Sequence, residues 1–102
     1  MPNLGLSQSD FITLTTELDV IINCAASINF DDPLLDAIQI NYFGCLRMLE
    51  LAKSCQHLVS HTHVSTAYVN SNIDGFIEER VYDLPGSPDP EERINTILKM
   101  NP

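Results

Sequence analysis

The chain has 102 residues, of which 44% are hydrophobic and 19% charged, a composition typical of a globular protein. This length accommodates one domain at most. The net charge is −9, and the five lysine and arginine residues are scattered along the chain. Without a basic patch to meet phosphates, the sequence argues against a nucleic-acid-binding surface.

Three cysteines, Cys24, Cys45 and Cys55, lie far apart and show no zinc-type spacing. This pattern predicts reduced thiols, and therefore an intracellular protein. The first residues lack the basic head and apolar core of a signal peptide. No apolar run approaches the roughly 18 residues of a spanning helix, so we expect no membrane segment in this chain.

The first third of the chain predicts a helix followed by a strand. Capping residues at 7–10 precede a short helical pattern over 11–18. A run of β-branched residues within 18–26 then predicts a parallel strand buried on both faces. The strand ends in small residues, including Ala25 and Ala26, which suit either the close approach of a flat ligand or tight packing against the next helix.

The longest predicted element is a helix over residues 33–54, with proline at its first turn. Apolar residues spread around most of its circumference, which predicts two buried faces. One face would meet the sheet, and the other a partner subunit, giving a homodimer through this helix. Asn41 lies within the apolar surround and is either a hydrogen-bonded core amide or a ligand contact.

A second extended pattern covers residues 58–64 and places His61 and His63 on one strand face. Since no third ligand is evident, packed or hydrogen-bonded histidines are the better interpretation, and we predict no metal site. Polar and proline-rich sequence follows until Pro90, where a last amphipathic helix begins.

Strand, long helix and strand together predict the central βαβ portion of a Rossmann-like, doubly wound parallel sheet, and so the α/β class. Parallel strands bring Ala25–Ala26 and Ser65–Thr66 to one carboxyl-terminal edge, where ligands bind in open α/β sheets. A hydroxyl of Ser65 or Thr66 could there orient a substrate carbonyl while a nicotinamide delivers hydride.

Two motifs expected of a complete enzyme are missing from the sequence. It contains neither a Gly-x-Gly-x-x-Gly phosphate loop nor a Tyr-x-x-x-Lys pair. We therefore expect residues 1–102 to form a partial NAD(P)-binding Rossmann domain that lacks the N-terminal glycine-rich loop and the C-terminal Tyr-x-x-x-Lys segment.

Three segments, residues 3–7, 19–34 and 63–69, resemble the fatty acyl-CoA reductase family. These proteins are extended short-chain dehydrogenases with a male-sterility type of NAD-binding domain. The sequences Phe-Asp-Asp-Pro-Leu and His-Val-Ser-Thr-Ala-Tyr-Val carry the resemblance, and residues 77–82 with the proline-rich tail also fit it. The resemblance covers almost the whole chain.

The resemblance implies a role for each site residue. Thr66 would match the catalytic hydroxyl that binds the substrate carbonyl, and Ser65 would lie beside the cofactor. Ala25 and Ala26 would line the adenosine side of NADPH, and Asn41 would match an asparagine of the long helix near the site. The family reduces a long-chain fatty acyl-CoA with NADPH to a fatty alcohol through the aldehyde, often at peroxisomal or endoplasmic reticulum membranes.

Three functions are compatible with these features. The first is a piece of such a reductase, inactive as the isolated chain. The second is another extended dehydrogenase, such as a carrier-linked thioester reductase. The third is a non-catalytic remnant that only packs or dimerises.

Overall fold

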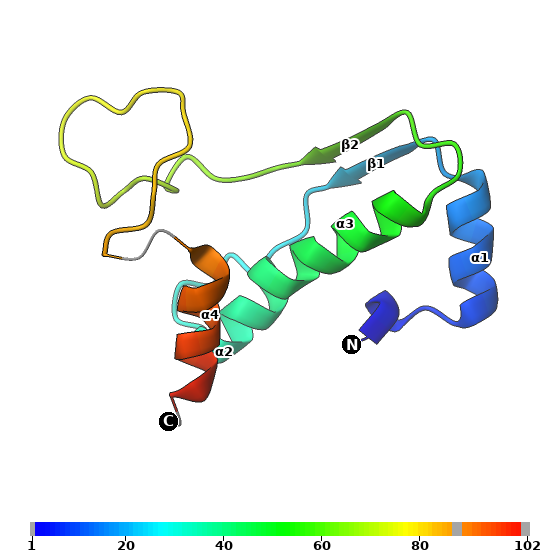
Figure 1. Ribbon diagram of the computed structural model, residues 1–102, viewed down its shortest axis with the longest axis horizontal. Helices are drawn as coiled ribbons and strands as arrows, with labels where there is room; N and C mark the ends of the chain where they lie inside the picture. The colour runs from blue at the N-terminus through cyan, green and yellow to red at the C-terminus, as the bar shows by residue number, and fades with distance from the viewer. Residues whose placement is uncertain (1, 87–88, 101–102) are drawn as a thin grey trace. The chain divides into compact units, whose positions relative to one another are not determined.

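The computed structural model describes residues 2–86 and 89–100 and divides into two compact units, Met1–Ser65 and Thr66–Pro102 (Figure 1). The elements of the first unit are η1 (Pro2–Gly5), α1 (Gln8–Glu17), β1 (Val20–Asn23), α2 (Leu34–Ala37), η2 (Ile38–Phe43), α3 (Gly44–Ser54) and β2 (Ser60–His63). The second unit contains α4 (Pro90–Lys99).

The first unit is a βαβ unit. Strands β1 and β2 are parallel, with Val20 opposite Ser60 and Asn23 opposite His63. The helical segments α2, η2 and α3 follow one another without a break and connect the two strands (Figure 1). A parallel pair needs a crossover of this length, so the structure confirms the predicted α/β class and the central portion of a Rossmann-like sheet.

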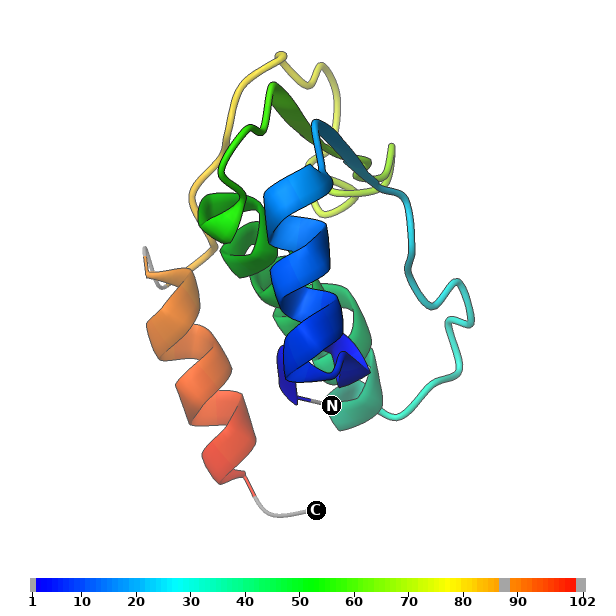
Figure 2. The same ribbon diagram turned by 90° about the vertical axis from the view of Figure 1, so that its right-hand side faces the viewer.

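The core of this unit forms where α3 packs on the sheet. Ile21 of β1 and Leu51 and Ala52 of α3 are its buried members. Partly buried apolar residues surround them: Leu4, Phe11, Leu18, Met48, Cys55 and Leu58. Helix α1 crosses the carboxyl-terminal end of α3 and supplies Phe11 to this cluster (Figures 1 and 2). One apolar face of the long helix, with Leu51, Ala52 and the partly buried Met48, therefore builds the core.

The prediction that the first strand is buried on both faces is wrong for the described chain. Ile21 and Asn23 are buried, whereas Val20 and Ile22 on the other face are 50% and 66% exposed. The helix covers only one side of the two-stranded sheet, so alternate side chains of β1 face solvent. The strand is also shorter than predicted, and Cys24, Ala25 and Ala26 follow it as irregular chain.

The predicted start of α1 is confirmed, and its cap is Ser7. The Ser7 Oγ accepts a hydrogen bond of 3.1 Å from the backbone N–H of Asp10. We expect Ser7→Ala to lower the free energy of unfolding by about 1 kcal/mol, because a helix N–H loses its partner. Urea titration followed by circular dichroism measures the change. The control, Gln8→Ala, removes an exposed side chain from the same turn without touching the cap and should leave stability within about 0.5 kcal/mol.

The long helix contains a π-helical turn at η2. The backbone N–H of Gly44 bonds to the carbonyl of Gln39, five residues back, so the turn holds one residue more than an α-turn. Asn41 lies inside this turn. The sequence pattern predicts the extent of the helix but not this turn, since the apolar spacing is compatible with an unbroken α-helix.

The second unit consists of a turn-rich segment and α4. Asp89 caps α4 by accepting a hydrogen bond from the Glu91 N–H, and Pro90 occupies the first turn, which confirms the predicted start. Before it, Arg80 pairs with Glu78 and lies over the ring of Tyr82.

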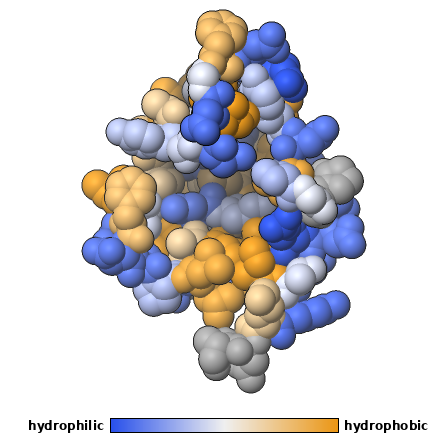
Figure 3. Space-filling view, turned by 90° about the vertical axis from the view of Figure 1, so that its left-hand side faces the viewer, coloured by the Kyte–Doolittle hydropathy of each residue, from blue (hydrophilic) through white to orange (hydrophobic). Residues whose placement is uncertain are grey.

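Apolar side chains lie open on the molecular surface, as the orange areas of Figure 3 illustrate. In the second unit these include Phe76 and Val81, which are almost fully exposed. Among the described residues, no helix combines the length and apolar character needed to cross a membrane.

Candidate cofactor-binding edge

The carboxyl ends of β1 and β2 form one edge of the sheet. Beyond the last strand pairing, the N–H of Val64 donates a 2.9 Å hydrogen bond to the carbonyl of Asn23. Ala25 and Ser65 therefore leave the two strands on the same side, as the βαβ pattern predicts. This edge is where open parallel sheets bind their ligands.

Ala25 and Ala26 provide the surface that a flat cofactor ring needs. Both residues are exposed and carry only a methyl group, so a ligand can reach the backbone closely. The residues present at this edge therefore fit the unphosphorylated part of a nicotinamide dinucleotide. Their assignment as cofactor-binding residues stays a prediction.

The side-chain amide of Asn41 is bonded to the loop that follows β1. Its Oδ1 accepts a 2.8 Å hydrogen bond from the N–H of Ser27, and its Nδ2 donates a 3.3 Å bond to the carbonyl of Ser27. Asn41 thus bonds both the backbone N–H and the backbone carbonyl of Ser27, the residue after Ala26. The structure brings Asn41 to the predicted edge, with its amide engaged by the backbone of the loop.

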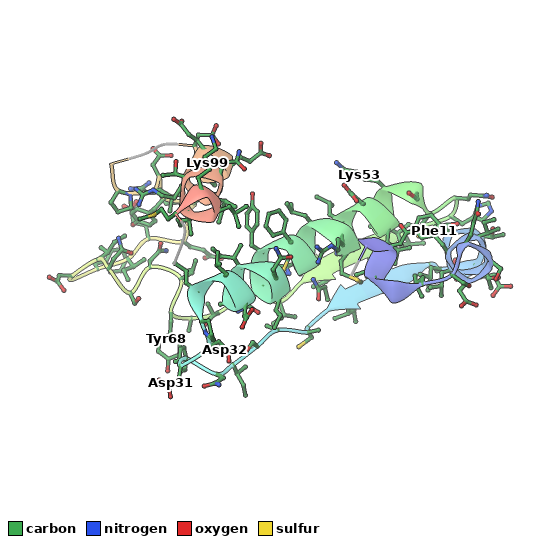
Figure 4. All side chains as sticks on the ribbon, turned by 90° about the horizontal axis from the view of Figure 1, so that it is seen from below. Phe11, Asp31, Asp32, Lys53, Tyr68 and Lys99 are labelled. Atoms are coloured by element: carbon green, nitrogen blue, oxygen red, sulfur yellow. The ribbon has the colours of Figure 1, made fainter. Side chains whose placement is uncertain are left out.

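The loop from Ser27 to Asp32 is tied together by its own side chains. The Asp32 carboxylate accepts hydrogen bonds from Ser27 Oγ and, at 2.9 Å, from Asn29 Nδ2. Asn29 Oδ1 accepts a 3.1 Å bond from the N–H of Asp31. We refer to residues 27–32 with these bonds as the clamped loop, on which Figure 4 labels Asp31 and Asp32.

The side-chain hydrogen bonds of the clamped loop were not predicted from the sequence. The signal was present as Ser-x-Asn-x-Asp-Asp, since short polar side chains with this spacing commonly bond the backbone of a turn.

A second polar group forms around His63. Its Nδ1 lies 3.5 Å from Asn23 Nδ2 and 3.8 Å from Cys45 Sγ. Cys45 in turn donates to the carbonyl of Asn41, at 2.9 Å. The prediction of a hydrogen-bonded histidine is confirmed for His63, whereas the buried Nε2 of His61 has no hydrogen-bond partner among the described residues.

Ser65 and Thr66 follow β2, and the boundary between the two units falls between them. Both residues are exposed. Within the second unit, Thr66 Oγ1 accepts a 3.2 Å hydrogen bond from the N–H of Tyr68. This bond uses an acceptor site of the hydroxyl and leaves its proton for donation to another group.

The described cations of the first unit lie away from this edge. Arg47 and Lys53 line a cavity of about 350 Å³ together with Leu4 and Phe11. Figure 4 places Lys53 and Phe11 at the opposite end of the long helix from Asp31 and Asp32. The residues of the first unit at the ligand edge therefore supply no positive charge for the phosphates of a dinucleotide.

These features define a class: a segment of an α/β dinucleotide-binding domain, with small residues and a polar loop at the carboxyl edge of parallel strands. The model of the male sterility protein family of NAD-binding domains matches residues 1–101. The chain belongs to this family. The ligand of this family of domains is a nicotinamide cofactor.

Among similar proteins, fatty acyl-CoA reductase 1 of Xenopus laevis is 38% identical over 98% of this chain and 19% of its own length. Fatty acyl-CoA reductase 1 of Arabidopsis thaliana is 40% identical over 80% of the chain and 17% of its own length. The human fatty acyl-CoA reductase 1 is 34% identical over 98% of the chain and 19% of its own length.

These matches confirm the resemblance that the sequence motifs predict. The chain spans about a fifth of the length of these relatives. No solved structure matches the chain significantly.

Proposed function

We propose that the chain is part of an NADPH-dependent fatty acyl-CoA reductase that converts a long-chain acyl-CoA to a fatty alcohol through the aldehyde. The observation that carries this proposal is the family match over residues 1–101, joined to an open cofactor edge at the ends of two parallel strands. The fatty acyl-CoA reductases among its relatives supply the substrate class.

Each predicted site residue has a physical role in this proposal. The bound cofactor supplies hydride to the carbonyl carbon of the substrate. The hydroxyl of Thr66 donates a hydrogen bond to the carbonyl oxygen and stabilises the negative charge that develops there. Ala25 and Ala26 let the cofactor approach the backbone, and Ser65 lies beside it. Asn41 acts on the cofactor through the clamped loop.

The proposal is tested with the full-length protein that carries this sequence. We expect NADPH to be consumed when palmitoyl-CoA is added, with fatty alcohol as the product in gas chromatography. NADH should support a slower reaction. Activity only on an acyl group attached to a carrier protein would contradict the proposal and favour the carrier-linked thioester reductase.

For the isolated 102-residue chain we propose no activity, as residues 1–102 form only part of the NAD(P)-binding domain. Its sequence contains no glycine-rich phosphate loop and no Tyr-x-x-x-Lys pair, and few cations could meet the cofactor's phosphates. We expect no NADPH oxidation and no NADPH binding in a fluorescence titration. Turnover by this chain alone would show that it contains a complete site.

A packing role has one structural observation in its favour. The long helix exposes Ile40, Leu46 and Leu49, each more than a third accessible. A homodimer through the long helix is the second candidate, and light scattering on the purified chain tests it. A monomer at all concentrations would contradict it.

A further inference from the structure

Asn23 is a buried polar residue that has no role in the proposed reaction as described so far. It ends β1, it is only 5% exposed, and it lies on the same face of the strand as the core residue Ile21. A buried amide lowers stability unless its donor and acceptor atoms are hydrogen-bonded. The partners of the Asn23 amide therefore indicate what this residue does.

The two ends of the Asn23 amide reach different parts of the ligand edge. Its Oδ1 accepts a 3.4 Å hydrogen bond from the backbone N–H of Ala25, the first residue of the proposed cofactor surface. Its Nδ2 lies 3.5 Å from Nδ1 of His63, which ends the neighbouring strand β2. Asn23 thus bridges the ends of the two strands that Figure 1 shows side by side, and it holds the backbone of Ala25.

The donor and acceptor in the contact with His63 follow from the other bond of the amide. Because the N–H of Ala25 can only donate, the oxygen of Asn23 faces it and the amide nitrogen faces the imidazole. The amide nitrogen can only donate, so Nδ1 of His63 accepts and the ring proton lies on Nε2. Cys45 does not compete for this acceptor, since its S–H donates to the carbonyl of Asn41. His63 is thus the acceptor that orients the Asn23 amide.

The segment of Ala25 and Ala26 is held on both sides. Asn23 bonds the N–H at its start, and Asn41 bonds both backbone groups of Ser27, which follows it. Ala25 and Ala26 carry only methyl groups, so their own side chains make no hydrogen bond that could fix the backbone. A backbone that is ordered before the cofactor binds has less conformational freedom to lose, which favours affinity.

We propose that Asn23 and His63 are positioning residues for the cofactor. His63 orients the amide of Asn23, and this amide fixes the backbone of Ala25, on which the nicotinamide dinucleotide packs. This inference rests on the proposed function. Neither side chain has to touch the cofactor or the substrate, so the pair affects cofactor affinity rather than the chemical step.

Two substitutions of His63 in the full-length protein separate its acceptor atom from its ring. His63→Phe keeps an aromatic ring without the acceptor, and we expect it to weaken NADPH binding about 5-fold in a fluorescence titration. His63→Asn loses the ring but keeps an acceptor at the same distance along the side chain as Nδ1, so its affinity should stay within about 2-fold. In both variants kcat at saturating NADPH should change less than about 2-fold.

A double-mutant cycle tests whether His63 acts through Asn23. Asn23→Leu removes both bonds of the amide and should weaken NADPH binding about 10-fold. Adding His63→Phe to Asn23→Leu should cause no further loss, because the bond that His63 accepts is already gone. The control is Thr62→Val, which alters the exposed neighbour of His63 on the opposite face of β2 and should leave the affinity unchanged.

Three results would overturn the inference: unchanged NADPH affinity in His63→Phe, equal losses in His63→Phe and His63→Asn, and additive losses in the double variant. Because His63 is exposed, its two variants decide the matter even if Asn23→Leu does not fold. Failure of the proposed function is distinguishable, since it would appear as absent turnover of palmitoyl-CoA by the unsubstituted protein, whereas NADPH affinity decides the inference.

Discussion

Thr66→Ala will lower the rate of acyl-CoA reduction by the full-length protein about 100-fold, the loss expected when one donor to a developing oxyanion is removed. The effect should appear mainly in kcat, because the charge on the carbonyl oxygen is greatest in the transition state. Single-turnover measurements with NADPH and palmitoyl-CoA report this step directly. The hydroxyl suits the role because its observed bond, from the Tyr68 N–H, leaves its proton for donation.

Two companion variants make this result interpretable. Thr66→Ser keeps a hydroxyl and should retain most of the rate. Ser65→Ala removes the neighbouring hydroxyl and should have a smaller effect than Thr66→Ala. If Ser65→Ala alone abolishes reduction while Thr66→Ala is silent, the catalytic role belongs to Ser65.

Asn41→Leu will weaken NADPH binding by the full-length protein about 10-fold. The substitution removes both hydrogen bonds to Ser27, each worth roughly 0.5–1.5 kcal/mol net. The cofactor would then have to order the loop as it binds, and about 1.4 kcal/mol corresponds to each tenfold change in affinity. Fluorescence titration with NADPH measures the effect.

The matched control for this variant is Gln39→Leu. It removes an exposed amide from the same π-helical turn, where the side chain contacts Arg47 rather than the loop. We expect its NADPH affinity to stay within about 2-fold. If Asn41→Leu binds NADPH with unchanged affinity while Gln39→Leu binds it more weakly, the hydrogen bonds of Asn41 to the clamped loop do not contribute to NADPH binding.

The secondary structure of the first unit could be predicted because its signals are local. The hydroxyl of Ser7 marks the start of α1, and the apolar spacing over residues 33–54 marks the long helix. The burial of β1 could not be predicted in the same way. Its β-branched run is compatible with one or two covered faces, and only the position of α3 decides which side chains are buried.

The sequence could predict where in the fold the candidate site lies, but not which hydrogen bonds its residues make. Parallel strands place Ala25 and Ser65 at one edge, since a right-handed βαβ unit has few alternatives. The hydrogen bonds between Asn41 and Ser27 join residues that are 14 positions apart in the sequence, and Asn41 makes them from within a π-helical turn. No periodic pattern in the sequence encodes such a turn. The sequence therefore could not decide whether Asn41 is a hydrogen-bonded core amide or a ligand contact.

The sequence by itself determined the βαβ order and the family, because these depend on residue types and their spacing. The tertiary structure decided that Asn41 holds the loop after β1 and that Asn23 contacts His63. Those facts depend on where side chains meet after the helix has packed on the sheet. The physical reason is that hydrogen bonding and burial are properties of neighbours in space, which the local pattern of a chain does not specify.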